Sequence, residues 1–460
     1  MKTKTIYAAL VAVLALGACK KNVQETIDRP VVASIHILQD GSTLPNVIAE
    51  RDTVILPEGG TFYLDGKTYV DSLGGLIINK GVKILGVKKS SPALASALVV
   101  TRGGYIDARG TATQPITFTS AETTKHSGDW GGVVVLGKST VNKVNPAIEG
   151  IDLPSLPIGV NVGYGGNKPT DKSGYLQYIK ILYAGASVTP NNELNGLTLG
   201  GVGSGTSIHH IFVYAGADDA FEFFGGTVNA QYLIAHSPND DCFDFDFGYS
   251  GKIQFAVSLL KTDANTFNGD ANGIESDNDG NASAATPLTN PVISNLTIIG
   301  GSTAVVPGTK NGNRWRRNTR LDIRNSIILG YGTTADPGIY FDPEVPETAF
   351  QHNLVHAFIN LSNKTLNVNN GQYTTGGTSN DSTRLRRPFG TWTIDPVSGA
   401  TTSFTFDARP VNTGAFPQLS PAREGADFTV PPYTSGFTVV AYRGAFSPTG
   451  TAAGWAQFAR

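Results

Sequence analysis

The sequence predicts an all-β protein that folds as a right-handed parallel β-helix closed by a C-terminal cap. The chain has 54 glycines and one methionine, and no long stretch shows a helical 3.6-residue repeat. From Asp52 onward, short apolar strands punctuated by glycine follow one another. In addition, one motif recurs after 22 residues, which indicates stacked structural units.

The first 18 residues have the features of a bacterial export signal. Lys2 and Lys4 precede an apolar run, residues 6–16, which is too short to span a bilayer of about 30 Å as a helix. The next segment, Leu16-Gly17-Ala18-Cys19, resembles the lipobox of bacterial lipoproteins. The resemblance implies that residues 1–18 are removed and that Cys19 is acylated, which gives a durable membrane anchor. The alternative is an ordinary secretory signal followed by an incidental cysteine.

The charge and the cysteine content narrow the range of partners and of stabilising bonds. Removal of Lys2 and Lys4 would change the formal net charge from −2 to −4, because no acidic residue is lost. This balance predicts neither a nucleic-acid partner nor an anionic membrane surface. If Cys19 carries lipid, Cys242 is the remaining thiol. The fold is then expected to depend on core burial rather than on a disulfide.

The mature chain is expected to have three parts. Residues 19–50 lack sustained periodicity and are predicted to be a lipidated tether with a lead-in segment. Residues 51–425 are predicted to form the β-helix. Residues 426–460 are predicted to cap the last coil, because an open solenoid end would expose strand edges.

The clearest internal repeat lies in the middle of the chain. Residues 218–224 (DDAFEFF) recur as residues 240–246 (DDCFDFD), and residues 273–277 (GIESD) form a weaker third copy. The strand at 232–234 is expected to keep the offset of 22 and to align with 254–256. A repeat of this length without helical segments fits one β-helix coil of three short strands. A β-propeller is the alternative, but its blades run to about 40 residues.

Further segments carry a family resemblance: 63–67 (YLDGK), 76–86, 102–111 (RGGYIDARGT), 115–120 (PITFTS), 129–132 (DWGG), 224–229 (FGGTVN), 247–249 (FGY) and 442–446 (YRGAF). Together they resemble a family of largely uncharacterised Bacteroidota-type outer-membrane lipoproteins with a right-handed, pectate-lyase-like β-helix. The resemblance covers most of the mature chain and implies a fold and a location, but no agreed activity. In that family, acidic residues after the acylated cysteine mark export to the cell surface. Here residues 20–22 are KKN, so the side of the membrane stays open.

An acidic ladder is the most informative candidate site. Side chains alternate along a strand, so phenylalanines that face the core leave outward-facing acids one coil apart, at Glu222, Asp244, Asp246, Glu275 and Asp277. Carboxylates about 5 Å apart repel unless a cation lies between them or one keeps its proton, and this predicts a calcium site. The aspartate pairs 218–219 and 240–241 open the same strands and could add ligands. The alternatives are a solvated face with turn-forming aspartates, and a catalytic or substrate-binding cluster.

Two basic segments are predicted to bind a ligand. Arginine binds carboxylates through two parallel hydrogen bonds, and tryptophan can stack on a sugar ring, so a groove lined by both would suit an acidic polysaccharide. The alternative is that these arginines pair with the acidic ladder or with strand-end carbonyls. The candidate residues are Arg314, Trp315, Arg316, Arg317, Arg384, Arg386 and Trp392.

The expected function is that of a non-catalytic, membrane-anchored module of the cell envelope that binds glycan or has a structural role. Its expected partners are the outer membrane, a polysaccharide and an outer-membrane protein. One alternative is a polysaccharide lyase or glycoside hydrolase acting on an acidic polymer. However, the Trp-Ile-Asp-His and Arg-x-Pro-x-x-Arg runs of pectate lyases are absent, and stacked carboxylates on a flat face make a poor hydrolase cleft. A second alternative is an accessory subunit of an uptake or assembly complex.

Overall fold

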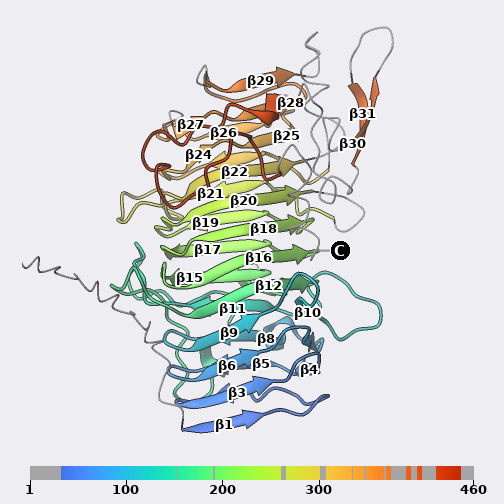
Figure 1. Ribbon diagram of the computed structural model, residues 1–460, viewed down its shortest axis with the longest axis vertical. Coiled ribbons are helices and arrows are strands. Elements are labelled where there is room, and N and C mark those ends of the chain that lie inside the picture. The colour runs from blue at the N-terminus through green and yellow to red at the C-terminus, as the bar shows by residue number, and fades with distance from the viewer. Residues whose placement is uncertain are drawn as a thin grey trace, which may run out of the picture.

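The computed structural model describes residues 33–151, 153–189, 192–260, 266–300, 307–333, 335–346, 349–366, 369–374, 390–394, 401–406 and 421–446. The coils stack along one long axis, from β1 at one end to β29 at the other (Figure 1). Neighbouring strands of the two large sheets pair in parallel, as in β17–β19 and β18–β20. The fold is a right-handed parallel β-helix, as the sequence predicts.

The larger sheet has 17 strands, which wrap around two sides of the solenoid. They are β1 (Ser34–Ile37), β3 (Asp52–Leu56), β4 (Thr61–Leu64), β6 (Gly75–Ile78), β7 (Lys83–Gly86), β9 (Tyr105–Arg109), β10 (Ile116–Ser120), β12 (Gly174–Leu182), β16 (Ser207–Tyr214), β18 (Ala230–His236), β20 (Lys252–Leu259), β22 (Val292–Ile299), β24 (Asp322–Arg324), β25 (Ile327–Tyr331), β27 (Phe350–Gln351), β28 (Leu354–Ala357) and β29 (Gly371–Thr374).

The smaller sheet has ten strands and forms the remaining side. They are β2 (Val47–Ile48), β5 (Lys67–Val70), β8 (Ala97–Val100), β11 (Gly132–Leu136), β15 (Leu197–Val202), β17 (Phe221–Gly226), β19 (Phe243–Asp246), β21 (Ile274–Ser276), β23 (Asn313–Trp315) and β26 (Ile339–Phe341). Two antiparallel hairpins join β13 (Ser187–Thr189) to β14 (Asn192–Glu193), and β30 (Gly390–Ile394) to β31 (Thr401–Phe406).

Helical structure within the described ranges is limited to short 3₁₀ turns, η1 (Pro92–Leu94), η2 (Leu153–Ser155) and η5 (Pro421–Arg423). Accordingly, this part of the chain contains no helix with the length and apolar character needed to span a membrane.

The long strands of the larger sheet turn a corner at a single residue with positive φ. These residues are Tyr178, His210, Tyr232, Phe255 and Asn295, with φ between 52° and 59°. The left-handed conformation is unfavourable for such side chains, so packing must hold them there. The first four stack their rings along the corner, with centroids 4.2, 4.4 and 5.2 Å apart. Ring stacking of this kind offsets part of the backbone strain.

The inside of the solenoid is filled by side chains of equivalent position in successive coils. Phe221 of β17 pairs with Phe243 of β19, and their ring centroids are 5.2 Å apart. Phe223 and Phe245 stack next to them at 5.1 Å. All four rings are at most 1% exposed. The predicted 22-residue register and the inward orientation of these phenylalanines are therefore confirmed.

The offset of 22 does not extend to the next strands. Leu233 of β18 pairs with Ala256 of β20, an offset of 23, so the expected alignment of 232–234 with 254–256 is wrong by one residue. A one-residue slip would exchange the faces of all side chains in the strand. Alignment of the two corner residues, Tyr232 and Phe255, fixes the observed register. The first coil also starts earlier than predicted, since β1 begins at Ser34.

The described part of the C-terminal segment, residues 421–446, does not cover the last coil. It crosses several coils along the outer face of the larger sheet. Gln254 exchanges two hydrogen bonds with the backbone of Thr438, at 2.7 and 2.8 Å. Asn325 makes an equivalent pair with the backbone of Asp427. Amide side chains in the coils of β20 and β24 therefore hold residues 421–446 against the side of the solenoid and not over its end. Residues 447–460 of the predicted cap lie outside the described residues.

Candidate functional site

The candidate site lies on the outer face of the smaller sheet, where side chains of equivalent position form a column. Glu222 of β17 pairs with Asp244 of β19, which pairs with Glu275 of β21, and Arg314 of β23 follows. The predicted acidic ladder thus exists in the predicted order. It is not a solvated face, however, since Glu222 is only 5% exposed.

The turns before these strands hold a second column of Asx residues. Each side-chain oxygen accepts the backbone N–H of the corresponding residue in the next coil, at 2.6–3.1 Å, through the series Asn195, Asp219, Asp241, Asn272 and Asn311. The column therefore caps backbone amides of the next coil through Asp219 and Asp241 and does not close local turns, so the turn-forming alternative stays a prediction. The column also fixes their carboxylates beside the ladder, buried at 7% and 4% exposure.

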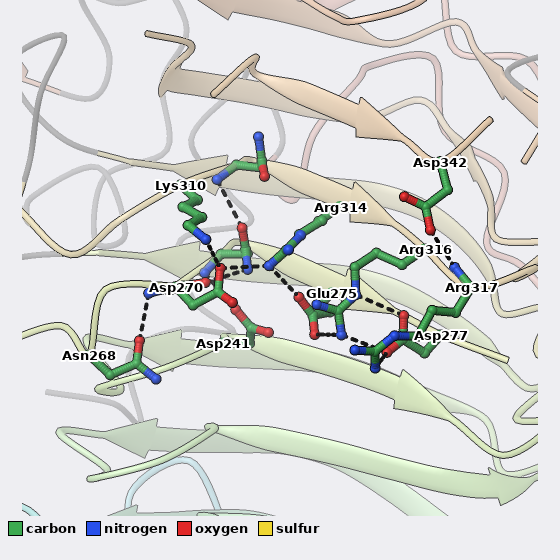
Figure 2. Close-up of polar contacts among 12 residues, drawn as sticks. Asp241, Asn268, Asp270, Glu275, Asp277, Lys310, Arg314, Arg316, Arg317 and Asp342 are labelled. Carbon is green, nitrogen blue, oxygen red and sulfur yellow. Dashed lines mark hydrogen bonds and ion pairs between the residues drawn. The ribbon is translucent and has the colours of Figure 1, made fainter. Parts of the chain in front are cut away.

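Arginine neutralises the β21 end of the ladder (Figure 2). Arg316 donates two hydrogen bonds to Asp277, at 2.9 and 2.7 Å, and also contacts Glu275 at 2.5 Å. Arg317 makes a further bond to Asp277. Arg314 bridges Glu275 and Asp270. The structure therefore supports the ion-pair alternative for these arginines, and it does not support calcium ligation by Glu275 and Asp277.

The β17 end of the ladder has no such cations. Oxygens of Asp219, Glu222 and Asp244 lie within 4.8 Å of one another, and those of Asp218, Asp219 and Asp240 form a second group with the same limit. Within the described residues, none of these five carboxylates forms an ion pair with lysine or arginine. One oxygen of Asp244, Oδ1, is buried without a hydrogen-bond partner.

Burial and like charge determine the protonation of this region. Burial raises the pKa of Asp219, Glu222 and Asp244 well above the ordinary carboxyl range, and neighbouring carboxylates raise it further. Burial also raises the pKa of Asp240 to about 6. Such a cluster cannot carry its full negative charge at neutral pH unless a cation binds to it, and otherwise it must retain protons.

A long insertion between β11 and β12, residues 137–173, covers part of the ladder. Its Glu149 lies near enough to Glu222 to raise the pKa of that carboxyl beyond the effect of burial. Burial, followed by the nearby Glu193, raises the pKa of Glu149 to about 7. Tyr164 of the insertion packs on Phe224 of β17, with ring centroids 6.1 Å apart. The insertion also lines a cavity of about 770 Å³. The cluster is therefore shielded by a loop, in addition to the sheet itself.

The other residues singled out in the sequence are placed as follows. Trp315 is 0% exposed and packs inside the solenoid on Phe341, with centroids 4.8 Å apart, so its predicted role on a ligand-binding surface is wrong. Trp315 points inward because it occupies a core-facing position of β23.

Trp392 lies in β30, where its backbone lies opposite that of Phe404 in the antiparallel hairpin. Asp246 lies beside Phe224 and accepts the N–H of Phe247. Cys19, Arg384 and Arg386 lie outside the described residues.

Two components of the site were missed in the sequence. Asn195 donates a hydrogen bond to Glu222, and it occupies the same position before β15 that Asp219 occupies before β17. Alignment of those two strands could have identified it. No sequence pattern around Glu149 marks it as a site residue. The unusual length of the segment between β11 and β12 was the available clue, because long structured loops often carry function.

Comparison with known proteins supports the fold. A model of the family described as "Pectate-lyase like beta helix domain" matches residues 47–390, which is most of the chain. Comparisons with curated proteins and with solved structures give no match. The chain therefore belongs to the pectate-lyase-like β-helix domain family.

Proposed function

We propose that this chain is a membrane-anchored, extracytoplasmic module that binds polysaccharide without catalysis and is stabilised by calcium on its acidic face. The observation that carries the proposal is the group of carboxylates at the β17 end of the ladder, which lie close together and form no ion pair with a lysine or arginine among the described residues. The parallel sheet adds a flat, repetitive surface of the kind that suits a polymer. Glycans are the polymers available outside the cell.

Calcium fits the central group of this ladder, Asp219, Glu222 and Asp244. Calcium takes only oxygen ligands, each about 2.3–2.6 Å away, so two oxygens on one ion are at most about 5 Å apart. The three carboxylates meet this limit as they stand. Calcium would also give the buried Oδ1 of Asp244 a partner, and an unpaired buried acceptor otherwise costs about 1–3 kcal/mol.

The ion would join two adjacent coils. Glu222 comes from β17, Asp244 comes from β19, and Asp219 comes from the turn before β17. Binding to the folded chain alone adds stability, about 2.7 kcal/mol when free calcium is 100 times its dissociation constant.

Titration of chelator-treated protein with calcium chloride tests this part of the proposal. We expect measurable heat of binding and a higher unfolding midpoint. Asp244→Asn should weaken calcium binding at least tenfold while keeping the side-chain shape. Asp65→Asn, at an exposed position outside the cluster, is the matched control and should bind as the wild type does. Calcium binding that is absent in the wild type, or unchanged in Asp244→Asn, would refute the calcium site.

The membrane anchor rests on the sequence around Cys19. We expect metabolic labelling with a radioactive or clickable fatty acid to mark the wild-type chain and to place it in the outer-membrane fraction. Cys19→Ser should remove the label and release the protein into a soluble fraction. A labelled or membrane-bound Cys19→Ser protein would show that the anchor lies elsewhere.

A glycoside hydrolase is the second candidate, because the pKa of Glu149 raised to about 7 is a property of a general acid. Against it, Glu149 lies beside the buried Glu222, and burial raises the pKa of both, whereas hydrolase carboxyls lie about 5–9.5 Å apart across the substrate. Release of reducing ends from a polysaccharide panel would favour the hydrolase. Ultraviolet absorbance from unsaturated uronic ends would favour a lyase, and binding without either product supports the module.

A further inference from the structure

The N-terminal end of the solenoid is formed by β1, which lies at the edge of the larger sheet (Figure 1). β1 pairs in parallel with β3, and no other described strand shares a register with it. Ser34 and Leu38 donate their backbone N–H groups to carbonyls on the side of β3. Backbone groups alternate in direction along a strand, so those of Ile35 and Ile37 point to the opposite edge. This edge therefore offers two donors and two acceptors to a further strand.

β1 lacks the features that usually keep an exposed sheet edge from pairing. Its sequence, Ser34–Ile37, contains no lysine, acid or proline, which are common on protected edges. Instead, Ile35 is 61% exposed and Ile37 is 66% exposed. His36 and Leu38 point to the other side and line a cavity of about 320 Å³ at the mouth of the core. An unpaired edge beside exposed apolar side chains indicates a surface that a partner covers.

The chain before β1 is too short to supply the missing strand in the manner of the other coils. Ser34 of β1 aligns with Asp52 of β3, 18 residues later. A strand placed one coil before β1 would therefore begin at Leu16 and end at Cys19. The cleavage that accompanies the proposed anchor removes most of that strand, and in this step the inference rests on the proposed function. The missing strand must then come from another chain.

β1 is complementary to a second copy of itself in the antiparallel direction. Centred on His36, this pairing places Ile35 of one copy opposite Ile37 of the second copy. These are the residues whose backbone groups point to the free edge, so they would exchange hydrogen bonds, and the two His36 residues would form the non-hydrogen-bonded pair between them. The exposed isoleucines would then cover each other in cross-strand pairs.

The proposed anchor is compatible with such a joint. The tether, residues 19–32, leaves the solenoid beside β1 and contains 14 residues, which reach at most about 50 Å when fully extended. Two copies that meet at β1 therefore start both tethers at the joint, and one membrane can hold both anchors. Anchoring in one membrane also raises the effective concentration of each copy for the other.

We propose that two copies of this chain associate end to end through β1, in an antiparallel pair centred on His36. The contact is isologous, since the same strand serves both copies, and it closes as a dimer instead of growing into a filament. The larger sheet of one solenoid would continue into that of the other across the joint.

Disulfide formation in membranes tests this pairing with the full chain. In His36→Cys, the two thiols would lie in a non-hydrogen-bonded pair, whose Cα atoms are about 4.5 Å apart, within the range of a disulfide. We expect oxidation with copper phenanthroline to give a covalent dimer on a non-reducing gel. Ser34→Cys is the matched control, because its copies would be about 13 Å apart and should stay separate. The described Cys242 is buried and should not react.

Sedimentation of the soluble Cys19→Ser chain measures association without the membrane, and we expect a dimer. In that background, Ile37→Lys should weaken association at least tenfold, because a charged side chain on an edge strand opposes pairing. Leu94→Lys, at an apolar position that is 56% exposed, is the control and should associate as the parent does.

Several outcomes would overturn the proposal. Equal cross-linking of the Ser34→Cys and His36→Cys chains, or none in either, contradicts the pairing. A monomer whose β1 amides exchange slowly would mean that the chain covers its own edge, and a cross-link to a different protein would mean a different partner. Loss of the fatty-acid label from the wild type would refute the anchor alone, because sedimentation decides the pairing without it.

Discussion

Replacement of Arg316 by alanine tests whether arginine neutralises one end of the acidic ladder. The Arg316 side chain is 13% exposed, and it holds Asp277 through two hydrogen bonds and Glu275 through one contact. Both carboxylates are themselves nearly buried, at 7% and 12% exposure. Removing one partner of a buried ion pair costs about 3–5 kcal/mol when the other charge stays behind without compensation. Here Arg317 still contacts Asp277 and Arg314 still contacts Glu275, so the lower end of that range applies. We therefore expect Arg316→Ala to lose about that much free energy of unfolding.

Urea denaturation, followed by tryptophan fluorescence in the presence of a chelator, measures this loss. Arg317→Ala is the matched control, because Arg317 contacts the same Asp277 but is 41% exposed. Solvent screening limits an exposed pair to about 0–1 kcal/mol, so the control should change little. Equal losses in both variants, or a loss below about 1 kcal/mol in Arg316→Ala, would refute the view that burial makes this pair important.

Three further outcomes follow from the fold and the cluster. Phe243→Ala should lower the free energy of unfolding by about 3–5 kcal/mol, measured in urea, because the ring is 1% exposed and its removal leaves a cavity. Without metal, the unfolding midpoint should fall as pH rises from about 4.5 to 7. Burial raises the pKa of Glu149 and Asp240, so the folded state binds more protons than the unfolded state in this range. A midpoint that does not change with pH would contradict this. Asn325→Ala should speed amide hydrogen exchange around Asp427, whose backbone it holds.

The sequence was sufficient for the β-helix and for the order of the ladder. The repeat of two aspartates followed by alternating phenylalanine and acid fixes which side chains enter the core, since neighbouring residues of a strand face opposite sides. Burial of Phe221 and Phe243 then requires Glu222 and Asp244 to stack outside. The predicted alignment of β18 with β20 failed because the number of residues per coil changes there from 22 to 23. A loop can lengthen by one residue without leaving a local sequence pattern.

The sequence by itself determined which residues form the ladder, because the two-residue alternation of a strand and the coil repeat are both local properties. Only the tertiary structure decided the charge of that ladder and its exposure. Arg316, Glu149 and the C-terminal segment come from distant parts of the chain, and no periodic pattern specifies which coil they meet. Their contacts depend on how coils stack and on the path of long loops. Neutralisation by arginine at β21 and the crowding of carboxylates with raised pKa at β17 are therefore consequences of the folded arrangement.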